Sequence, residues 1–310
     1  LWRNAVYMLA GLEVPETPVD APDKVYNIGY ITADKTMVTT AAQPDNDPII
    51  QMLRTYPEFN VDVQVVSGTA EVDLSGYDVV VVQEGFGSGD AILTPTGSLG
   101  LENIEVPFVY NKAYALRNGR AVTSATASAN QIPANELYMT VEAGKEGHPI
   151  FSGITLTDNE VKIFNTPGHD DGGSGAKTLN FTLDLEMTDL NTLLGILKGA
   201  EGNVSVCLND IPAGTVLGTE DTLQARMIAV SQNFGTICKD NGMNLTDEGL
   251  TLWRNAIFLA AGLEPPDDLY MNPDRKVKVA YVNLSKTMAA TATQPDNDPI
   301  IQMMAHYPEF

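Results

Sequence analysis

One long segment occurs twice in this chain, and the repeat limits the possible folds more than any other feature. Residues 1–59 return as residues 252–310 without a gap, so the two copies are offset by 251 positions. Solenoid repeats recur after only about 20–50 residues. A period of 251 residues matches instead the size of one globular domain with its own core. We therefore interpret the chain as a section of a longer tandem polypeptide in which each period folds as one domain.

Differences between the copies place the expected domain boundaries. Residues 2–12 carry apolar side chains at helical spacing, and in the second copy Thr246 supplies an N-cap for the same helix. The copies diverge most in the proline- and aspartate-rich segments that follow, which are typical of extended linkers because proline fixes φ and lacks an N–H donor. The expected units, in chain order, are the closing helix of a preceding repeat (1–12), a linker (13–23), a complete repeat domain (24–263), a second linker (264–275) and the start of the next repeat (276–310).

The chain is strongly acidic, with a net charge of −22 from 40 acidic and 18 basic residues. Such a surface repels nucleic acids and anionic membranes, so we expect neither as a partner. The charge favours solubility, a saline exterior or the binding of divalent cations. No apolar stretch approaches the roughly 20 residues that cross a bilayer, so we expect no membrane span in this segment.

Short apolar runs that alternate with a helical pattern predict an α/β fold. The helix between the first two runs begins with Asp47-Pro48, a cap followed by proline in the first turn. Strands that are apolar along their whole length are typical of parallel sheets covered on both faces. We therefore predict three layers, in which a mostly parallel sheet has helices on both faces. The predicted strands are 25–31, 59–67, 77–85 and 106–111.

Beyond residue 120 helical patterns become rare and strand-like segments dominate. We expect most of these segments to build an antiparallel β extension. The last of them, 225–234, is expected to rejoin the main sheet before the closing helix 246–263. The extension segments are 137–143, 160–166, 179–187 and 204–210.

Three segments resemble the class I glutamine amidotransferase-like fold, in particular its trehalose-utilisation-type branch. Residues 105–119, EVPFVYNKAYALRNG, are similar to that family's strand and nucleophile elbow. Residues 147–154, GHPIFSGI, resemble its His-Pro-Ile-x-x-Gly segment, and residues 244–263 resemble its closing helix. The resemblance spans residues 24–263 in patches and implies a cleft at the elbow.

The chain departs from this family at the residue that would carry out catalysis. The family's nucleophilic cysteine lies five positions after the elbow's proline, and counting from Pro107 that position holds Lys112. Tyr114 stands where the family has a glycine. Without a thiolate at the elbow, the resemblance does not imply nucleophilic catalysis. Glu84 is expected to form a buried ion pair with Lys112, so Glu84, Lys112 and Tyr114 mark a vestigial cleft.

Two oxygen-rich loops are candidate metal sites, and each has a structural alternative. Asp45 and Asp47 follow the first strand, at the edge where α/β sheets place ligands, and their oxygens suit Ca²⁺. The alternative is that Asp47 caps the helix and Asp45 supports the turn. His169, Asp170 and Asp171 form the second cluster, for which the alternative is a solvated loop flanked by glycines. No other cofactor is expected.

The two cysteines, Cys207 and Cys238, leave two states open. They form a disulfide if the compartment is oxidising, or both stay as buried free thiols. His148, in the His-Pro-Ile segment, is expected to be a structural turn residue.

These patterns favour a structural role. We expect a non-catalytic repeat unit of an extracellular filament, sheath or cell-surface stalk, in which neighbouring repeats contact each other head to tail. One alternative is a secreted hydrolase or amidotransferase-like enzyme acting on a carbohydrate or amide. Another is a carbohydrate-binding adhesin, whose copies raise avidity.

Overall fold

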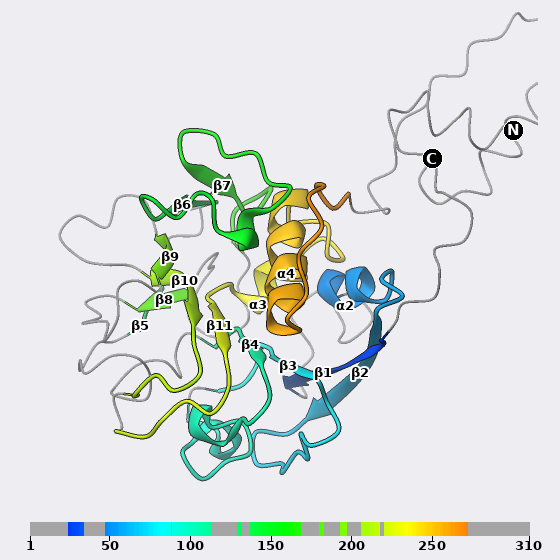
Figure 1. The fold of residues 1–310 in the computed structure, drawn as a ribbon, viewed down its shortest axis with the longest axis vertical. Coiled ribbons are helices and arrows are strands. Elements are labelled where there is room, and N and C mark those ends of the chain that lie inside the picture. The colour runs from blue at the N-terminus through cyan, green and yellow to red at the C-terminus, as the bar shows by residue number, and fades with distance from the viewer. Residues whose placement is uncertain are drawn as a thin grey trace, which may run out of the picture.

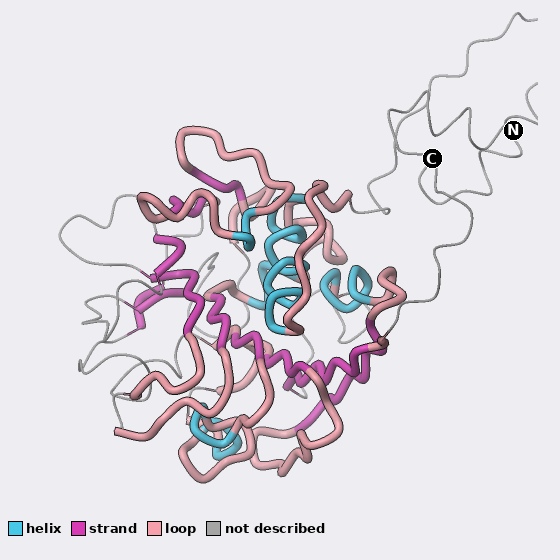
Figure 2. The backbone as a smooth tube through the Cα atoms, in the orientation of Figure 1, coloured by secondary structure: helices cyan, strands magenta, loops and turns pink. Residues whose placement is uncertain are grey.

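The described part of the chain forms one mixed β-sheet with helices packed against it (Figures 1 and 2). In the computed structural model, the sheet order is β2-β1-β3-β4-β11-β10-β9-β6-β7, with β8 and β5 paired off this path. The predicted α/β class is therefore confirmed. The structure describes residues 24–33, 47–87, 89–112, 129–131, 137–168, 180–182, 193–196, 206–217 and 220–271.

Five neighbouring strands form the parallel half of the sheet. Each of them pairs in parallel with the next, in the order β2-β1-β3-β4-β11. The last strand returns to the main sheet beside β4, as the sequence predicted. The five strands are β1 (Tyr26–Ala33), β2 (Phe59–Val66), β3 (Val79–Val82), β4 (Phe108–Tyr110) and β11 (Met227–Val230).

The antiparallel extension continues the sheet from β11. Strand β10 pairs antiparallel with β11, β9 and β8, and β6 pairs antiparallel with β9 and β7. Two strands of this region, β5 and β9, were not predicted, because their sequences, ANQ and LLGI, contain few of the β-branched and aromatic residues that indicate a strand. The extension consists of β5 (Ala129–Gln131), β6 (Tyr138–Val141), β7 (Glu160–Lys162), β8 (Asn180–Thr182), β9 (Leu193–Ile196) and β10 (Val206–Ile211).

Alternate residues of each parallel strand pack into two separate cores. Ile28 and Tyr30 of β1 face the core beneath the α-helices, whereas Ile31 and Ala33 face the other core. The first core is covered by α2 (Pro48–Leu53), α3 (Phe234–Ile237), α4 (Asp247–Ala260) and the 3₁₀ turn η4 (Pro149–Phe151). In the described residues, the second core is covered by loops and the 3₁₀ turns η1 (Ala91–Leu93) and η2 (Leu101–Asn103) (Figure 1).

The closing helix α4 forms where the sequence predicted it. The Thr246 hydroxyl accepts a hydrogen bond from the Gly249 amide at 2.8 Å and caps the helix, and two acidic residues in the first turn favour its positive end. Trp253 is fully buried against the sheet. The helix ends before Gly262, whose φ of +73° is the left-handed conformation that suits glycine. No helix in the described ranges is long and apolar enough to span a membrane.

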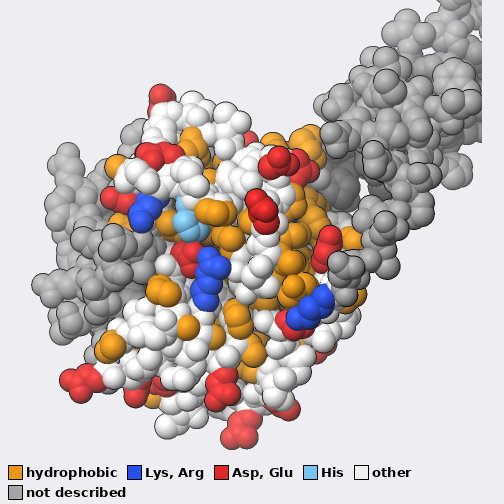
Figure 3. Space-filling model, viewed as in Figure 1, with side chains coloured by type: hydrophobic (Ala, Val, Ile, Leu, Met, Phe, Trp, Pro, Cys, Tyr) orange, Lys and Arg blue, Asp and Glu red, His pale blue; other side chains and the backbone are white. Residues whose placement is uncertain are grey.

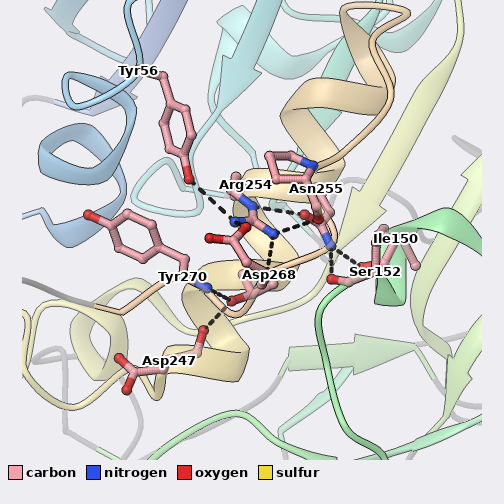
Figure 4. Close-up of polar contacts among 10 residues, drawn as sticks. Tyr56, Ile150, Ser152, Asp247, Arg254, Asn255, Asp268 and Tyr270 are labelled. Atoms are coloured by element: carbon pink, nitrogen blue, oxygen red, sulfur yellow. Dashed lines mark hydrogen bonds and ion pairs between the residues drawn. The ribbon is translucent and has the colours of Figure 1, made fainter. Parts of the chain in front are cut away.

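The first residues of the expected second linker return to α4 instead of leaving the domain. We call residues 264–271 the strap. Arg254, fully buried on α4, donates hydrogen bonds to the Asp268 carboxylate at 2.8 Å and to the Pro266 and Asp268 carbonyls (Figure 4). The Tyr270 amide donates to the Thr251 hydroxyl at 2.9 Å. The strap is therefore part of the folded domain, and only residues 272–275 of the expected linker lie outside the described residues.

Candidate functional site

The polar residues that follow the parallel strands meet at the carboxyl edge of the sheet. Tyr30, near the end of β1, donates a hydrogen bond from its hydroxyl to the Asp47 carboxylate at the start of α2. Gln83, directly after β3, donates from Nε2 to the same hydroxyl at 2.7 Å. All three side chains are essentially inaccessible to solvent. This edge is where open α/β sheets place their ligands, and here it is filled by the protein's own side chains.

The network continues across the sheet to α4. Asn111, directly after β4, donates to the Gln83 side-chain oxygen and, at 2.9 Å, to the Gln232 carbonyl. The Gln232 amide donates back to the Asn111 side chain at 2.8 Å, so the ends of β4 and β11 are joined twice. The Gln232 side chain in turn accepts from the Trp253 indole at 2.8 Å. A buried chain of hydrogen bonds thus runs from α2 to α4, and buried networks of this kind are costly to leave partly satisfied.

The ion pair expected between Glu84 and Lys112 is present. Lys112 Nζ lies 3.0 Å from the Glu84 carboxylate and 2.8 Å from the Glu84 carbonyl oxygen. The other carboxylate oxygen accepts from the Phe234 amide, at the start of α3. Lys112 and Glu84 are 5% and 7% exposed, so the pair is almost completely withdrawn from water. Tyr114, the third residue of the predicted vestigial cleft, lies outside the described residues.

Burial shifts the ionisation of the network's acidic groups. Desolvation raises the pKa of Asp47 to about 6, although the hydrogen bonds from Tyr30 and from the Ile49 and Ile50 amides act in the opposite direction. The pKa of Tyr30 is held well above its ordinary value by burial and by the neighbouring Asp47 carboxylate. Asp47 is thus a carboxyl group that titrates near neutral pH.

Of the candidate metal ligands, the structure describes only Asp47. Asp47 acts as the N-cap of α2, accepting from the Ile49 amide at 2.9 Å, which agrees with the structural alternative. Its partner in the predicted loop, Asp45, is outside the described residues, as are His169, Asp170 and Asp171. Within the described ranges no group of three or more His, Cys, Asp or Glu side chains is arranged to hold a metal ion. The Ca²⁺ hypothesis at these loops stays a prediction.

A second polar cluster joins the extension to the helices. His148 caps η4, accepting from the Ile150 amide at Nδ1, while its Nε2 lies 3.2 Å from the Asp210 carboxylate on β10. Arg226 binds the same carboxylate through two nitrogens and donates to the Leu259 carbonyl on α4. Burial acts to raise the pKa of Asp210, but Arg226 and His148 lower it to about 2. His148 is therefore a structural turn residue, as expected.

The structure shows which of the two expected states the cysteines adopt. Cys207 on β10 and Cys238 at the end of α3 are both free and buried, so the disulfide alternative is wrong for this structure. Burial raises the pKa of both thiols, and the Asp47 carboxylate raises that of Cys238 further. A thiol held in this way is a poor nucleophile, because the thiolate is the reactive form.

Sequence reasoning missed most of the network. The metal hypothesis and the cap hypothesis together identified Asp47, and the resemblance identified Lys112. A usable signal was present, since Gln83, Asn111 and Gln232 each follow a buried strand at the edge where such ends converge. Their mutual hydrogen bonds nevertheless join residues up to 121 positions apart, which the sequence pattern alone does not reveal.

Comparisons with known proteins add a likeness of fold. No family model matches the chain, and no curated protein matches it. Among solved structures, it is similar to a ThuA-like protein from Parabacteroides merdae, with a TM-score of 0.48 and 12% sequence identity over 80% of this chain and 98% of the other. This likeness concerns the fold alone. The trehalose-utilisation-type branch and the tandem arrangement stay predictions.

The arrangement of these side chains favours a role in stabilising the fold over a role in catalysis. Lys112 occupies the position that the resemblance assigns to the nucleophile, and its ammonium group donates to Glu84 instead of offering a free electron pair. The surrounding amides and hydroxyls donate to and accept from one another. Together they connect the ends of four parallel strands with α2, α3 and α4.

Proposed function

We propose that this chain is a non-catalytic structural unit of an extracellular filament, sheath or cell-surface stalk built from tandem α/β domains. The observation that carries the proposal is the buried Glu84–Lys112 pair at the edge where an α/β enzyme would bind its substrate. Ion pairs with both partners withdrawn from water contribute to a fixed arrangement, and they leave no reactive group exposed to a substrate.

The sequence repeat supports the same proposal. Two copies of the segment 1–59, offset by one domain length, are typical of proteins that extend by adding domains in a row. The acidic surface suits a protein that stays soluble outside the cell, and Figure 3 shows acidic side chains scattered over the visible face with few basic ones.

Electron microscopy of the protein isolated from its natural source tests this proposal. The proposal predicts rows of domain-sized particles at a regular spacing, joined head to tail. Isolated particles that hydrolyse an amide or glycoside would support the enzymatic alternative. Isolated particles that bind polysaccharide without turnover would support the adhesin alternative. Either result would overturn the filament proposal.

A further inference from the structure

The chain carries two copies of the segment that forms β1 and α2, but the described domain has a single position for that segment. The described residues 25–33 and 47–59 belong to it, with β1 lying between β2 and β3. Residues 276–310 are the second copy and repeat the α2 sequence from Asp298-Pro299 onward. We call the position between β2 and β3 the β1 slot. Repeated segments can exchange between domains, so the slot must select between the two copies, which differ at seven of the eight positions of β1.

The strap ends close to this slot. The Tyr270 ring lies 6.2 Å from that of Tyr56, which in turn contacts the Phe59 ring. Phe59 pairs with Tyr26 at the start of β1. The strap thus ends beside the place where β1 begins. Five further residues reach position 276, and they can span about 17 Å when extended.

Gly29 is a position at which the second copy needs space that the slot does not provide. A Cβ atom built on Gly29 would lie 2.5–2.8 Å from three atoms of the Tyr77 ring. The contacts include Cγ, so the whole ring would have to move and not merely its tip. The second copy has Ala280 at the corresponding position. The methyl group of Ala280 therefore cannot enter the β1 slot while Tyr77 keeps its place.

Tyr77 is held in that place by its hydroxyl group. The hydroxyl contacts the side chains of Asp62 and Gln64 on β2, and Asp62 is the register partner of Gly29. The ring thus crosses β1 at Gly29 and is anchored on the neighbouring strand. Displacing it would break both contacts.

A second difference acts in the same direction. Ala33, 3% exposed in the core on the same face as Gly29, is replaced by Leu284 in the second copy. A larger side chain at a packed site forces its neighbours to shift. By contrast, Tyr30 and Asp47 recur as Tyr281 and Asp298, so the buried network does not distinguish the copies.

We infer that the β1 slot selects residues 25–59 over residues 276–310 through the fit of Gly29 beneath Tyr77. The contact is a specificity determinant that keeps the two copies of this segment from exchanging strands. This inference does not depend on the proposed function, because it concerns which segment completes the domain.

A crosslinking competition within the full chain tests the inference. Asn60 on β2 contacts Asn27 on β1 at 2.9 Å, and both are exposed. The substitutions Asn60→Cys, Asn27→Cys and Lys278→Cys place one thiol on β2 and one on each copy. A short bis-maleimide then joins position 60 to whichever copy fills the slot, and mass spectrometry of the peptides identifies it.

With the native glycine and alanine, we expect crosslinks from position 60 to position 27 and not to position 278. Exchanging the determinant by Gly29→Ala together with Ala280→Gly, with Leu284→Ala added to remove the second obstacle, should raise the 60-to-278 crosslink about tenfold or more. Gly76→Ala is the matched control, because a Cβ there meets nothing within 4 Å, and it should leave the pattern unchanged.

Three results would overturn the inference. The first is crosslinking of position 60 to both copies in the native background. The second is an unchanged preference for position 27 after the exchange, and the third is loss of both crosslinks after the exchange. Circular dichroism of each variant reports whether the domain is folded while the slot is probed.

Discussion

At the scale of single residues, the site is defined by charged groups that are buried away from solvent. Lys112 and Glu84 form a buried pair in which Lys112 donates to the Glu84 carboxylate and carbonyl, and the Phe234 amide donates to the same carboxylate. Removing one partner of such a pair leaves an uncompensated charge, whereas replacing both with neutral groups of similar size is often close to neutral. The pair therefore favours one arrangement of the strand ends more than it adds net stability.

Lys112→Ala should lower the free energy of unfolding by about 3–5 kcal/mol, because it leaves the Glu84 carboxylate buried without its cation. Urea denaturation monitored by circular dichroism measures this change. The double variant Glu84→Gln with Lys112→Met is the control and should remain within about 1–2 kcal/mol of the native protein. Equal losses in the two variants would contradict the pairing argument.

The raised pKa of Asp47 predicts that the free energy of unfolding falls as the pH rises. Its folded pKa, about 6, lies above the ordinary value of 3.8, so the folded state retains a proton that the unfolded chain releases. The resulting stabilisation is complete below pH 3.8 and is lost as the pH rises through 6, at up to about 1.4 kcal/mol per pH unit.

Asp47→Asn removes this titration while keeping an N-cap side chain. The native protein's stability relative to the variant should therefore decline between pH 4 and pH 6.5 and level off above that range. Urea denaturation of both proteins across the range gives the difference. A relative stability that rises with pH would show that the folded state favours the carboxylate.

At the scale of elements, strong local patterns were predictable. The four-valine strand β3 and the capped helix α4 carry their signals within a few residues, and both occur where expected. Strand β9 was missed because its four residues, LLGI, include a glycine and two leucines, which are not typical of strands. The strap was interpreted as linker because its prolines and aspartates resemble one, whereas its docking depends on Arg254.

Comparison of the two copies indicates that Arg254 holds the strap more than Asp268 does. In the first copy the arginine recurs as Arg3, while the position of Asp268 is Thr17. Two of the hydrogen bonds from Arg254 reach backbone carbonyls, which any sequence supplies. The Asp268 side chain is 71% exposed, and exposed ion pairs contribute little.

Arg254→Ala should therefore release the strap and lower the free energy of unfolding by about 3 kcal/mol or more, because it removes a fully buried side chain and leaves the carbonyls unpaired. Asp268→Ala is the matched control, with an expected loss of about 1 kcal/mol or less. Hydrogen exchange at residues 264–271 reports the release directly. Fast exchange in both variants alike would indicate that the carboxylate holds the strap.

At the scale of the whole molecule, two hydrophobic cores lie on opposite faces of one sheet, and the polar residues at the carboxyl edge of that sheet are buried. The sequence predicted the parallel sheet and the antiparallel extension, because these follow from apolar patterns. It did not predict which polar groups meet, because Tyr30, Gln83, Asn111 and Gln232 come from four separate strands. Their convergence at one edge joins the ends of the strands by hydrogen bonds, which agrees with the proposed structural role.

The most direct test of this account is a turnover assay on the purified full chain with amide and glycoside substrates. The double variant Glu84→Gln with Lys112→Met, shown to be folded, is assayed in parallel. We predict no turnover by either protein, because Lys112 stands at the position of the nucleophile and the described polar side chains of the edge are buried. Turnover by the native chain that disappears in the double variant would establish a working active site and contradict the account.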